Sequence, residues 1–245
     1  MAVDKVVILW AGCGRRISSE YDGIHKAMIP LNGKPLMEYL LANIRKAGAK
    51  EIVPILGYKA EEMKEKITAI SGGWFDKIDF VISEKYAETN NLYSLVQASD
   101  ILSGKDFVVV NGDMVFDYRI LSDIMKCEGN AIATDGNDYG YQLDSPRILI
   151  KNDRIYDIGR HMTIEQAQGY AVGIYKFGAE FSPIYFEKGR ELSTKKPSAG
   201  YHEPMEPMFD EIIVKPSYTK GYLWMDVDEK ADVARAEEML RKLGN

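Results

Sequence analysis

Two glycines and three basic residues near the N-terminus have the types and spacing of a loop that binds polyphosphate. Apolar residues at 6–10 predict a buried parallel strand, which stops at the segment Ala-Gly-Cys-Gly-Arg-Arg, residues 11–16. Two glycines separated by one residue let the backbone turn tightly and approach a ligand. Consecutive N–H groups in such a turn can form an anion nest, and Arg15, Arg16 and Lys26 add positive charge. We therefore expect this loop to bind the phosphates of a nucleotide.

Spacing separates the classes of glycine loop that could account for this pattern. A dinucleotide fingerprint, Gly-x-Gly-x-x-Gly, needs a third glycine where Ile17 stands. The Walker pattern, Gly-x-x-x-x-Gly-Lys-Ser/Thr, does not occur in the chain. What remains is Gly-x-Gly-x-Arg, followed at a distance by Lys26 and Pro30. From the loop alone, a glycine turn with surface arginines remains an alternative.

Two aspartates follow apolar, strand-like segments and predict a metal site. Asp113 comes after the run at 107–112, and Asp226 after Leu-Trp-Met at 223–225. Mg²⁺ prefers octahedral oxygen ligation from one or two carboxylates and the phosphates of a substrate. Asp113 and Asp226 are therefore our predicted Mg²⁺ ligands, although an aspartate after a strand can also simply form a turn. For Asp228 we predict the N-cap of the last helix.

Composition restricts the class of protein. The chain has 245 residues, 46% hydrophobic and 28% charged, which suits a single α/β domain. Its apolar runs are too short for a membrane span, and the N-terminus lacks a signal-peptide pattern. Two cysteines, Cys13 and Cys127, form no disulfide framework, so we expect a cytoplasmic protein without membrane insertion. The net charge of −6 argues against nucleic acid as a partner.

Strands and helices alternate through the first half of the chain. Strands are predicted at 6–10, 51–56, 78–82 and 106–110, and helices at 35–48, 60–70 and 91–102. This order predicts an α/β fold, a Rossmann-like, mostly parallel sheet with helices on both faces. Beyond Cys127 the predicted strands are shorter, at 130–134, 147–150, 154–158 and 170–177. Helices are predicted at 179–189 and 203–213, and a last strand at 222–227 precedes a helix at 229–243. We expect one domain, 1–245, with a nucleotide-binding core at 1–128. Residues 129–245 are expected to form a smaller β-rich, acceptor-binding lid plus a returning core strand and helix.

The loop, Lys26, Asp113 and Asp226 together resemble the signature of nucleotidyltransferases that load sugar phosphates, phosphocholine or phosphonates onto a nucleotide. The segment Ser-Glu-Lys-Tyr-Ala-Glu-Thr-Asn-Asn-Leu-Tyr-Ser, 83–94, is similar to one that lies against the pyrimidine and ribose in phosphocholine cytidylyltransferases. Residues 149–160 and 169–177 also look like family strands, so the resemblance covers nearly the whole chain. It implies a nucleotide-diphospho-sugar transferase-like fold.

The resemblance also implies roles for individual residues. Arg16 would stabilise the leaving pyrophosphate, and Lys26 would approach the reacting phosphate. The implied nucleotide-binding residues are Ala11, Gly12, Cys13, Gly14, Arg15, Ser83, Asn90, Asn91, Ser94 and Gly112. The expected acceptor-binding residues are Asp135, Tyr139, Tyr141, Arg160, Tyr170, Gly173, Tyr201 and Glu206.

Some positions depart from the family pattern. Trp10 stands where a small alanine is usual, Arg15 where serine or threonine is usual, and Arg160 where lysine is usual. Tyr170 stands where an acid is common, which suggests a different acceptor. Tyrosines and carboxylates at 135–144 and 201–206 suit an ammonium group, held by charge and cation–π contact. Exposed polar loops that contain tyrosine explain them equally well.

We therefore expect an Mg²⁺-dependent cytidylyltransferase, an enzyme of EC 2.7.7 type. CTP and a small phosphate or phosphonate acceptor, with phosphocholine or 2-aminoethylphosphonate favoured, would give a CDP- or CMP-linked product and pyrophosphate. A sugar 1-phosphate or inositol phosphate with CTP or UTP is the alternative within this class. Outside it, an oxidoreductase is disfavoured by Ile17, whereas a catalytically inactive nucleotide-binding regulatory domain stays open. A homodimer or a fusion to a partner enzyme domain is compatible with the sequence.

Overall fold

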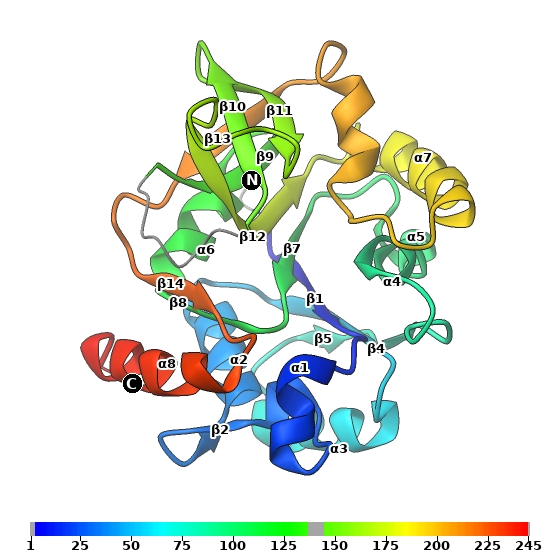
Figure 1. The fold of residues 1–245 in the computed structure, drawn as a ribbon. Coiled ribbons are helices and arrows are strands. Elements are labelled where there is room, and N and C mark those ends of the chain that lie inside the picture. The colour runs from blue at the N-terminus through cyan, green and yellow to red at the C-terminus, as the bar shows by residue number, and fades with distance from the viewer. Residues whose placement is uncertain (1–2, 137–144, 245) are drawn as a thin grey trace.

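A central mixed sheet organises the molecule (Figure 1). The computed structural model describes residues 3–136 and 145–244. The main path of the sheet has the strand order β11-β10-β12-β7-β1-β4-β5, with β6 beside β4, β9 beside β12 and β13 beside β9. Within those described ranges, no helix combines the length and apolar character needed to cross a bilayer.

The first half of the chain forms the parallel part of this sheet, as predicted. β1 lies between β4 and β7, parallel to both, and β4 pairs in parallel with β5 and β6. The strands are β1 (Lys5–Trp10), β4 (Glu51–Leu56), β5 (Lys77–Ile78), β6 (Val81–Ile82) and β7 (Phe107–Asn111). The predicted strand at 78–82 is thus two short strands, and its break lies opposite Pro54. A proline, which has no N–H to donate, fits where the pairing is interrupted.

Helices cover both faces of the parallel strands because the side chains of β1 alternate between two cores. Val6 and Ile8 pack in the core of α2 (Leu36–Lys46), α3 (Ala60–Ser71) and α6 (Tyr118–Lys126). Val7 packs in the opposite core, with α4 (Asn91–Val96), α5 (Ser99–Leu102) and α7 (Ser182–Lys195). The single helix predicted at 91–102 is two helices in the structure, α4 and α5.

The lid is continuous with the central sheet through one long strand, β12 (Gly169–Phe177). Its second half pairs antiparallel with β7, and its first two residues pair with β10. Its other edge pairs with β9, with a register shift between Ala171 and Tyr175 that contains Gly173 at a φ of +78°. The other lid strands are β9 (Asn130–Asp135), β10 (Arg147–Lys151), β11 (Arg154–Gly159) and β13 (Val214–Tyr218).

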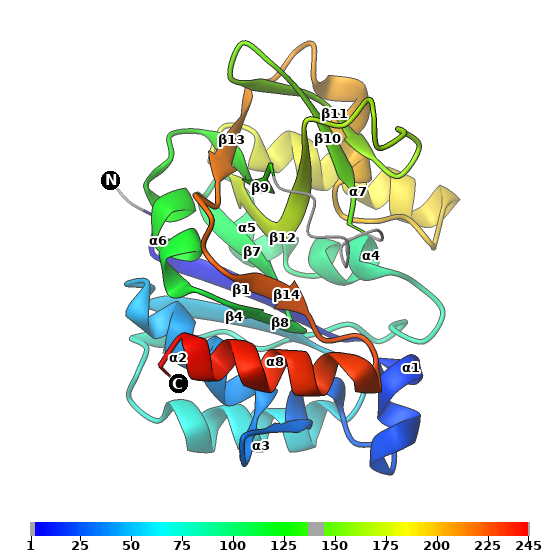
Figure 2. The ribbon, with the colours of Figure 1, turned by 60° about the vertical axis from the view of Figure 1, so that its left-hand side comes forward.

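The end of the chain returns to the core (Figure 2). β14 (Trp224–Asp226) pairs antiparallel with β8 (Met114–Phe116), and α8 (Lys230–Lys242) packs beside them in a third apolar cluster. The prediction that Asp228 caps α8 is wrong. Glu229 is the N-cap, in a capping box with Asp232. The remaining short elements are α1 (Arg15–Ser18), η1 (Ser19–Tyr21), η2 (Lys26–Met28), β2 (Pro30–Leu31), β3 (Lys34–Pro35) and η3 (Glu203–Met208).

Candidate active site

The glycine loop follows β1 at the carboxyl edge of the parallel strands. Gly14 has left-handed backbone angles, φ 58° and ψ 45°, and a Cβ there would lie 2.8 Å from the Cβ of Lys26. Both its conformation and its closeness to Lys26 therefore require glycine. A Cβ on Gly12 would meet no atom within 4 Å, so this part of the loop is open to a ligand. Ile17, which excludes the dinucleotide fingerprint, is fully buried in the core around α8.

Lys26 begins η2 and lies between two carboxylates. Its Nζ donates to Asp113 Oδ2 at 2.8 Å and to Asp228 Oδ1 at 2.6 Å, and only 10% of its side chain is exposed. Burial alone would lower the pKa of this amine, but the charges of Asp113 and Asp228 outweigh burial and raise the pKa above its ordinary value. Lys26 is thus held as a cation at the predicted metal pair.

The pairing of β8 with β14 brings the two predicted metal ligands together. Asp226 is opposite Met114, the residue after Asp113, and the Val227 N–H donates to the Asp113 carbonyl at 2.8 Å. Burial, followed by the charges of Asp113 and Asp228, raises the pKa of Asp226 well above its ordinary value. Its Oδ1 is buried and has no hydrogen-bond partner among the described residues.

An orphaned carboxylate oxygen beside other carboxylates is suited to a hard cation such as Mg²⁺. The described residues contain no cluster of three or more acidic, histidine or cysteine side chains arranged for a metal. Phosphate or water oxygens would therefore have to complete the coordination of a cation at Asp113 and Asp226.

Asp228 belongs to this charged group, although the sequence led us to assign it elsewhere. Its Oδ1 accepts from Lys26 and lies 3.2 Å from the guanidinium of Arg16. A signal was present in the sequence, since Asp226 and Asp228 are two residues apart and side chains at that spacing share one side of an extended chain. Arg16 is 60% exposed and lines the larger cavity of the site, whereas the side chain of Arg15 lies outside what the structure describes.

A cavity of about 210 Å³ adjoins the glycine loop and contains much of the predicted nucleotide site. Its walls include the predicted residues Ala11, Gly12, Asn90, Asn91, Ser94 and Gly112. Ser83 is fully buried behind this wall, with its Oγ 3.0 Å from that of Ser94. Tyr86, Thr89 and Asn111 also line the cavity and were not predicted. Cys13 is half-buried in the loop itself.

A larger cleft, about 940 Å³, extends from Asp113 and Asp226 toward the lid. It is lined by four predicted acceptor residues, Arg160, Gly173, Tyr201 and Glu206. Two others lie elsewhere. Tyr170 is buried in β12, and Asp135 is fully buried, where its Oδ2 accepts from the Trp224 indole at 2.6 Å. Tyr139 and Tyr141 lie outside the described residues.

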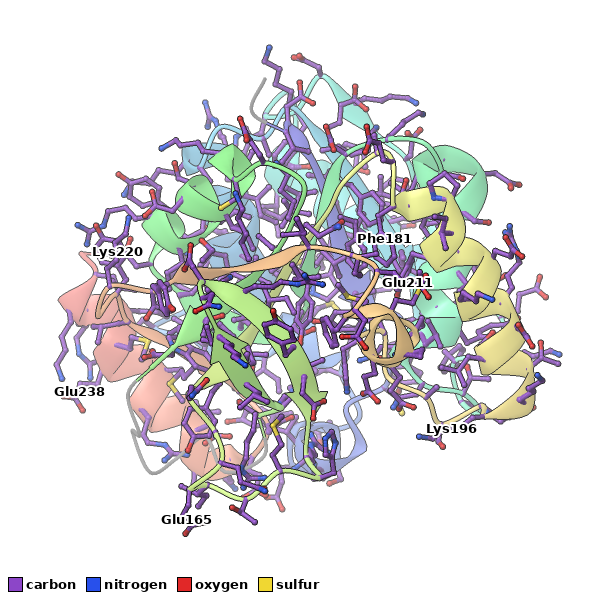
Figure 3. The ribbon with its side chains drawn as sticks, turned by 90° about the horizontal axis from the view of Figure 1, so that it is seen from above. Glu165, Phe181, Lys196, Glu211, Lys220 and Glu238 are labelled. Atoms are coloured by element: carbon purple, nitrogen blue, oxygen red, sulfur yellow. The ribbon has the colours of Figure 1, made fainter. Side chains whose placement is uncertain are left out.

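Several cleft residues were not predicted because segments distant in the chain supply them. The unpredicted titratable and aromatic residues of the lid side are His161, Tyr175, Lys196 and His202. Lys196, the C-cap of α7 and labelled in Figure 3, donates to Glu203 of η3 at 2.6 Å. Burial lowers the pKa of His202 to about 4, whereas burial and the charge of Glu203 raise the pKa of Glu206. From the core side, Asp232 and Arg235 of α8 also reach the cleft.

Hydrogen bonds join the two cavities along their common wall. The Asn90 amide donates to the Ser198 carbonyl at 3.0 Å, and the Asn91 Oδ1 accepts from the Tyr201 N–H at 2.9 Å. The Tyr201 hydroxyl donates to Asn111 Oδ1 at 3.1 Å. Residues that bound the smaller cavity are therefore tied to the segment that bounds the larger one.

A nucleotide-sized cleft at the carboxyl edge of parallel strands, with a glycine loop, a caged lysine and paired aspartates, defines a nucleotidyltransferase. The chain belongs to the MobA-like NTP transferase domain family, whose model matches residues 6–169. The fold is also that of the inositol-1-phosphate CTP transferase from T. maritima, with a TM-score of 0.84. That comparison covers 100% of this chain and 98% of the other at 20% identity, and it confirms the predicted fold class.

Curated relatives include enzymes named for cytidylyl transfer. The chain is 28% identical over 151 residues to the choline-phosphate cytidylyltransferase of Streptococcus pneumoniae, 56% of this chain and 62% of that protein. It is 29% identical over 132 residues to a CMP-5'-(3-aminopropyl)phosphonate synthase of Streptomyces rubellomurinus, 53% of this chain and 20% of that protein. The matched segments thus span less than two thirds of each relative.

Proposed function

We propose that this chain transfers a cytidylyl group from CTP to the phosphate or phosphonate oxygen of a small acceptor, with Mg²⁺ bound at Asp113 and Asp226. The observation that carries the proposal is the caged Lys26, whose amine donates to Asp113, which lines both cavities, and to Asp228, which lines the larger one. A cation at this position, beside carboxylates that can hold a second cation, suits a site where two phosphate groups must approach each other.

Charge neutralisation is the main requirement of this reaction. An oxygen of the acceptor attacks the α-phosphorus, the new P–O bond forms, the bond to the β-phosphate oxygen breaks, and pyrophosphate leaves with the electron pair. The acceptor oxygen is already ionised near neutral pH, so no general base is needed. Unit charges 4 Å apart repel by about 4 kcal/mol at an effective dielectric of about 20. Mg²⁺ would supply Lewis-acid charge, and Lys26, Arg16 and the loop amides are placed to lower the remaining repulsion.

The smaller cavity suits the base and ribose. It is bounded by the glycine loop, the Asn90–Asn91 pair and Ser94, which provide N–H, amide and hydroxyl groups for a pyrimidine edge and sugar. The preference for CTP rests on the relatives named above, whose names specify choline-phosphate cytidylyl transfer and a CMP-linked phosphonate product.

The larger cleft suits an acceptor with an anionic end and an ammonium end, such as phosphocholine or 2-aminoethylphosphonate. Arg160 and Lys196 can attract the phosphate or phosphonate. Glu206 is half-buried with a raised pKa, so a neighbouring ammonium would stabilise its charged form. The rings of Tyr175 and Tyr201 pack edge to face in the same wall, with their centroids 4.7 Å apart. Aromatic walls suit quaternary ammonium groups.

Pyrophosphate release tests the proposal. The purified protein is assayed with Mg²⁺, each of the four ribonucleoside triphosphates, and separate acceptors: phosphocholine, 2-aminoethylphosphonate, inositol phosphate and hexose 1-phosphates. We expect release with CTP and an aminated acceptor, and its loss on chelation of Mg²⁺. Release with UTP and a hexose phosphate would show instead that the nucleotide is UTP and the acceptor a sugar phosphate. CTP binding without turnover on any acceptor would favour a regulatory nucleotide-binding domain.

A further inference from the structure

Two buried aromatic side chains connect the groups that we place around the reacting phosphates. We infer that Trp10 and His25 are positioning residues for nucleotidyl transfer, which together fix Lys26 relative to Asp113. This inference rests on the proposed function, because that function gives Lys26 and Asp113 their roles. Among the described residues that line the two cavities, neither Trp10 nor His25 appears, so both act through the residues they hold.

His25 connects the end of β1 to the segment that carries Lys26. It is 2% exposed, and its Nδ1 accepts from the N–H of Ala27 at 3.1 Å, which makes it the N-cap of η2. Because Nδ1 is an acceptor, the ring proton of the neutral imidazole is on Nε2. Nε2 lies 3.0 Å from the Trp10 carbonyl and therefore donates to it. Both ring nitrogens are thus used, and the start of η2 is tied to the last residue of β1.

Trp10 connects the same strand end to the loop that carries Asp113. Its indole N–H donates to the Gly112 carbonyl at 2.7 Å, and the ring is 2% exposed. Gly112 fits against this ring closely, since a Cβ at residue 112 would lie 2.2 Å from Trp10 Cδ1 and 2.4 Å from the Leu9 carbonyl. The peptide directly before Asp113 is therefore held against the indole both by a hydrogen bond and by shape.

The two connections close a ring of contacts. Trp10 binds His25 through its carbonyl and Gly112 through its indole, and the residues that follow these two, Lys26 and Asp113, meet at 2.8 Å. Trp10 therefore helps to fix the positions of both Lys26 and Asp113. Misplacement of a catalytic group by about 1 Å can cost roughly 100-fold in rate, so loss of either connection should reduce turnover more than it reduces stability.

Conservative variants separate positioning from packing. W10F keeps most of the ring and removes the indole donor, and H25N keeps an N-cap acceptor but is too short to reach the Trp10 carbonyl. The matched control is Y39F, which removes a buried hydroxyl bond of 2.8 Å to the Leu31 carbonyl. For all three, kcat and KM for CTP are measured together with Tm. The rate at which an acylating reagent labels Lys26 is followed by mass spectrometry, with the exposed Lys34 as internal reference.

We expect W10F and H25N to lose roughly tenfold to 100-fold in kcat, with KM changed much less, and to label faster at Lys26. Y39F should match the wild type in kcat and in labelling. If W10F and H25N lose only Tm, or if Lys26 labelling rises while kcat stays within about twofold of the wild type, the inference is wrong. If the wild type releases no pyrophosphate with any substrate, the proposed function fails, and unchanged labelling of Lys26 in both variants would separately overturn the positioning role.

Discussion

At the scale of single residues, the site depends on charges that are held close together. Lys26 is bonded to two carboxylates, and Asp226 retains a buried oxygen without a hydrogen-bond partner among the described residues. Groups arranged in this way repel or attract strongly because burial lowers the local dielectric. Substitution of Asp226 should therefore have opposite effects on activity and on stability.

Loss of the lysine or of Asp113, the first proposed metal ligand, should remove most turnover. K26A removes the cation that is bonded to Asp113 and Asp228, and D113A removes a carboxylate from the proposed Mg²⁺ site. We expect each to reduce kcat by roughly 100-fold or more, the effect of removing one group that stabilises charge in a transition state. Steady-state pyrophosphate release measures this, with circular dichroism to verify folding. Near-normal rates in either folded variant would contradict the site.

Substitution of Asp226 by asparagine should raise stability and lower activity. Burial and two neighbouring carboxylates disfavour its charge, so the neutral amide of D226N removes that repulsion without a change in shape. We expect a higher Tm than the wild type in metal-free buffer at pH 7, and a kcat lower by roughly 100-fold with Mg²⁺. Thermal unfolding with a chelator and turnover with Mg²⁺ test the two halves. A lower Tm with retained turnover would show that Asp226 serves packing and not a metal.

At the scale of secondary-structure elements, helix termini determine where the charged groups lie. Asp232 of α8 accepts from the N–H groups of Asp228 and Glu229, each at 2.8 Å. It therefore stabilises the turn that points Asp228 at Lys26. The start of η2 is held in the same way by His25.

Removal of the α8 cap should affect both stability and turnover. We expect D232A to lose about 1 kcal/mol of unfolding free energy, the usual cost of a lost cap, and to reduce kcat as well because Asp228 moves. D117A is the matched control. Asp117 caps α6 by accepting from the Arg119 N–H, and lies outside both cavities of the site. Urea unfolding and turnover of both variants decide the matter, and an equal kcat for the two would show that the α8 cap serves stability alone.

The cap of η2 should make stability depend on pH. Burial lowers the pKa of His25 from 6.5 to about 4, despite a bond to the Trp10 carbonyl and with Lys26, Lys59 and Glu62 as charged neighbours. The unfolded chain then takes up a proton near pH 6.5 while the folded chain does not. The neutral, buried His25 therefore stabilises the folded chain fully above pH 6.5, and this stabilisation is lost as the pH falls toward 4. At pH 5 the free energy of unfolding should be lower by about 2 kcal/mol.

The difference between two proteins isolates this contribution, because His202 has a similarly lowered pKa and remains in both. The unfolding free energy of the wild type and of H25N is measured in urea at pH 7.5 and pH 5. We expect the wild type to lose more stability than H25N over this interval, by about 2 kcal/mol. Parallel losses would mean that His25 is protonated in the folded protein.

Sequence patterns determine local elements better than they determine the partners in the site. The strand at β4 was predicted with its observed bounds because a run of apolar residues between turns has few alternatives. Helix α6 was missed, although Asp117 and the apolar residues 120, 121, 124 and 125 carry the cap and the helical spacing. Lys196 and His202 could not be predicted, since only packing of α7 and η3 against the sheet brings them to the cleft. Asp228 was assigned as a cap because a local rule explained it fully, whereas its partner Lys26 is 202 residues away.

At the scale of the whole molecule, the site joins parts of the chain that contact one another only in the folded state. The N-terminal loop, the end of β7, the returning β14–α8 segment and the lid all line the larger cleft. A ligand that contacts all of them should stabilise the folded chain and have little affinity for the unfolded one. Stability therefore reports binding even where no acceptor is known.

CTP with Mg²⁺ should accordingly raise the Tm more than either alone. A ligand at 100 times its dissociation constant adds about 2.7 kcal/mol, and for a chain of this size each kcal/mol corresponds to roughly 2–4 °C. We expect an increase of roughly 5–10 °C with CTP and Mg²⁺, a smaller one with the other nucleotides, and loss of the increase on addition of a chelator. D113A should lose the Mg²⁺-dependent part, because the cation would bridge the protein and the phosphates. An equal increase in the Tm of D113A would support the nucleotide site but show that the metal binds elsewhere. No increase in Tm with any nucleotide would exclude the glycine loop as a phosphate site.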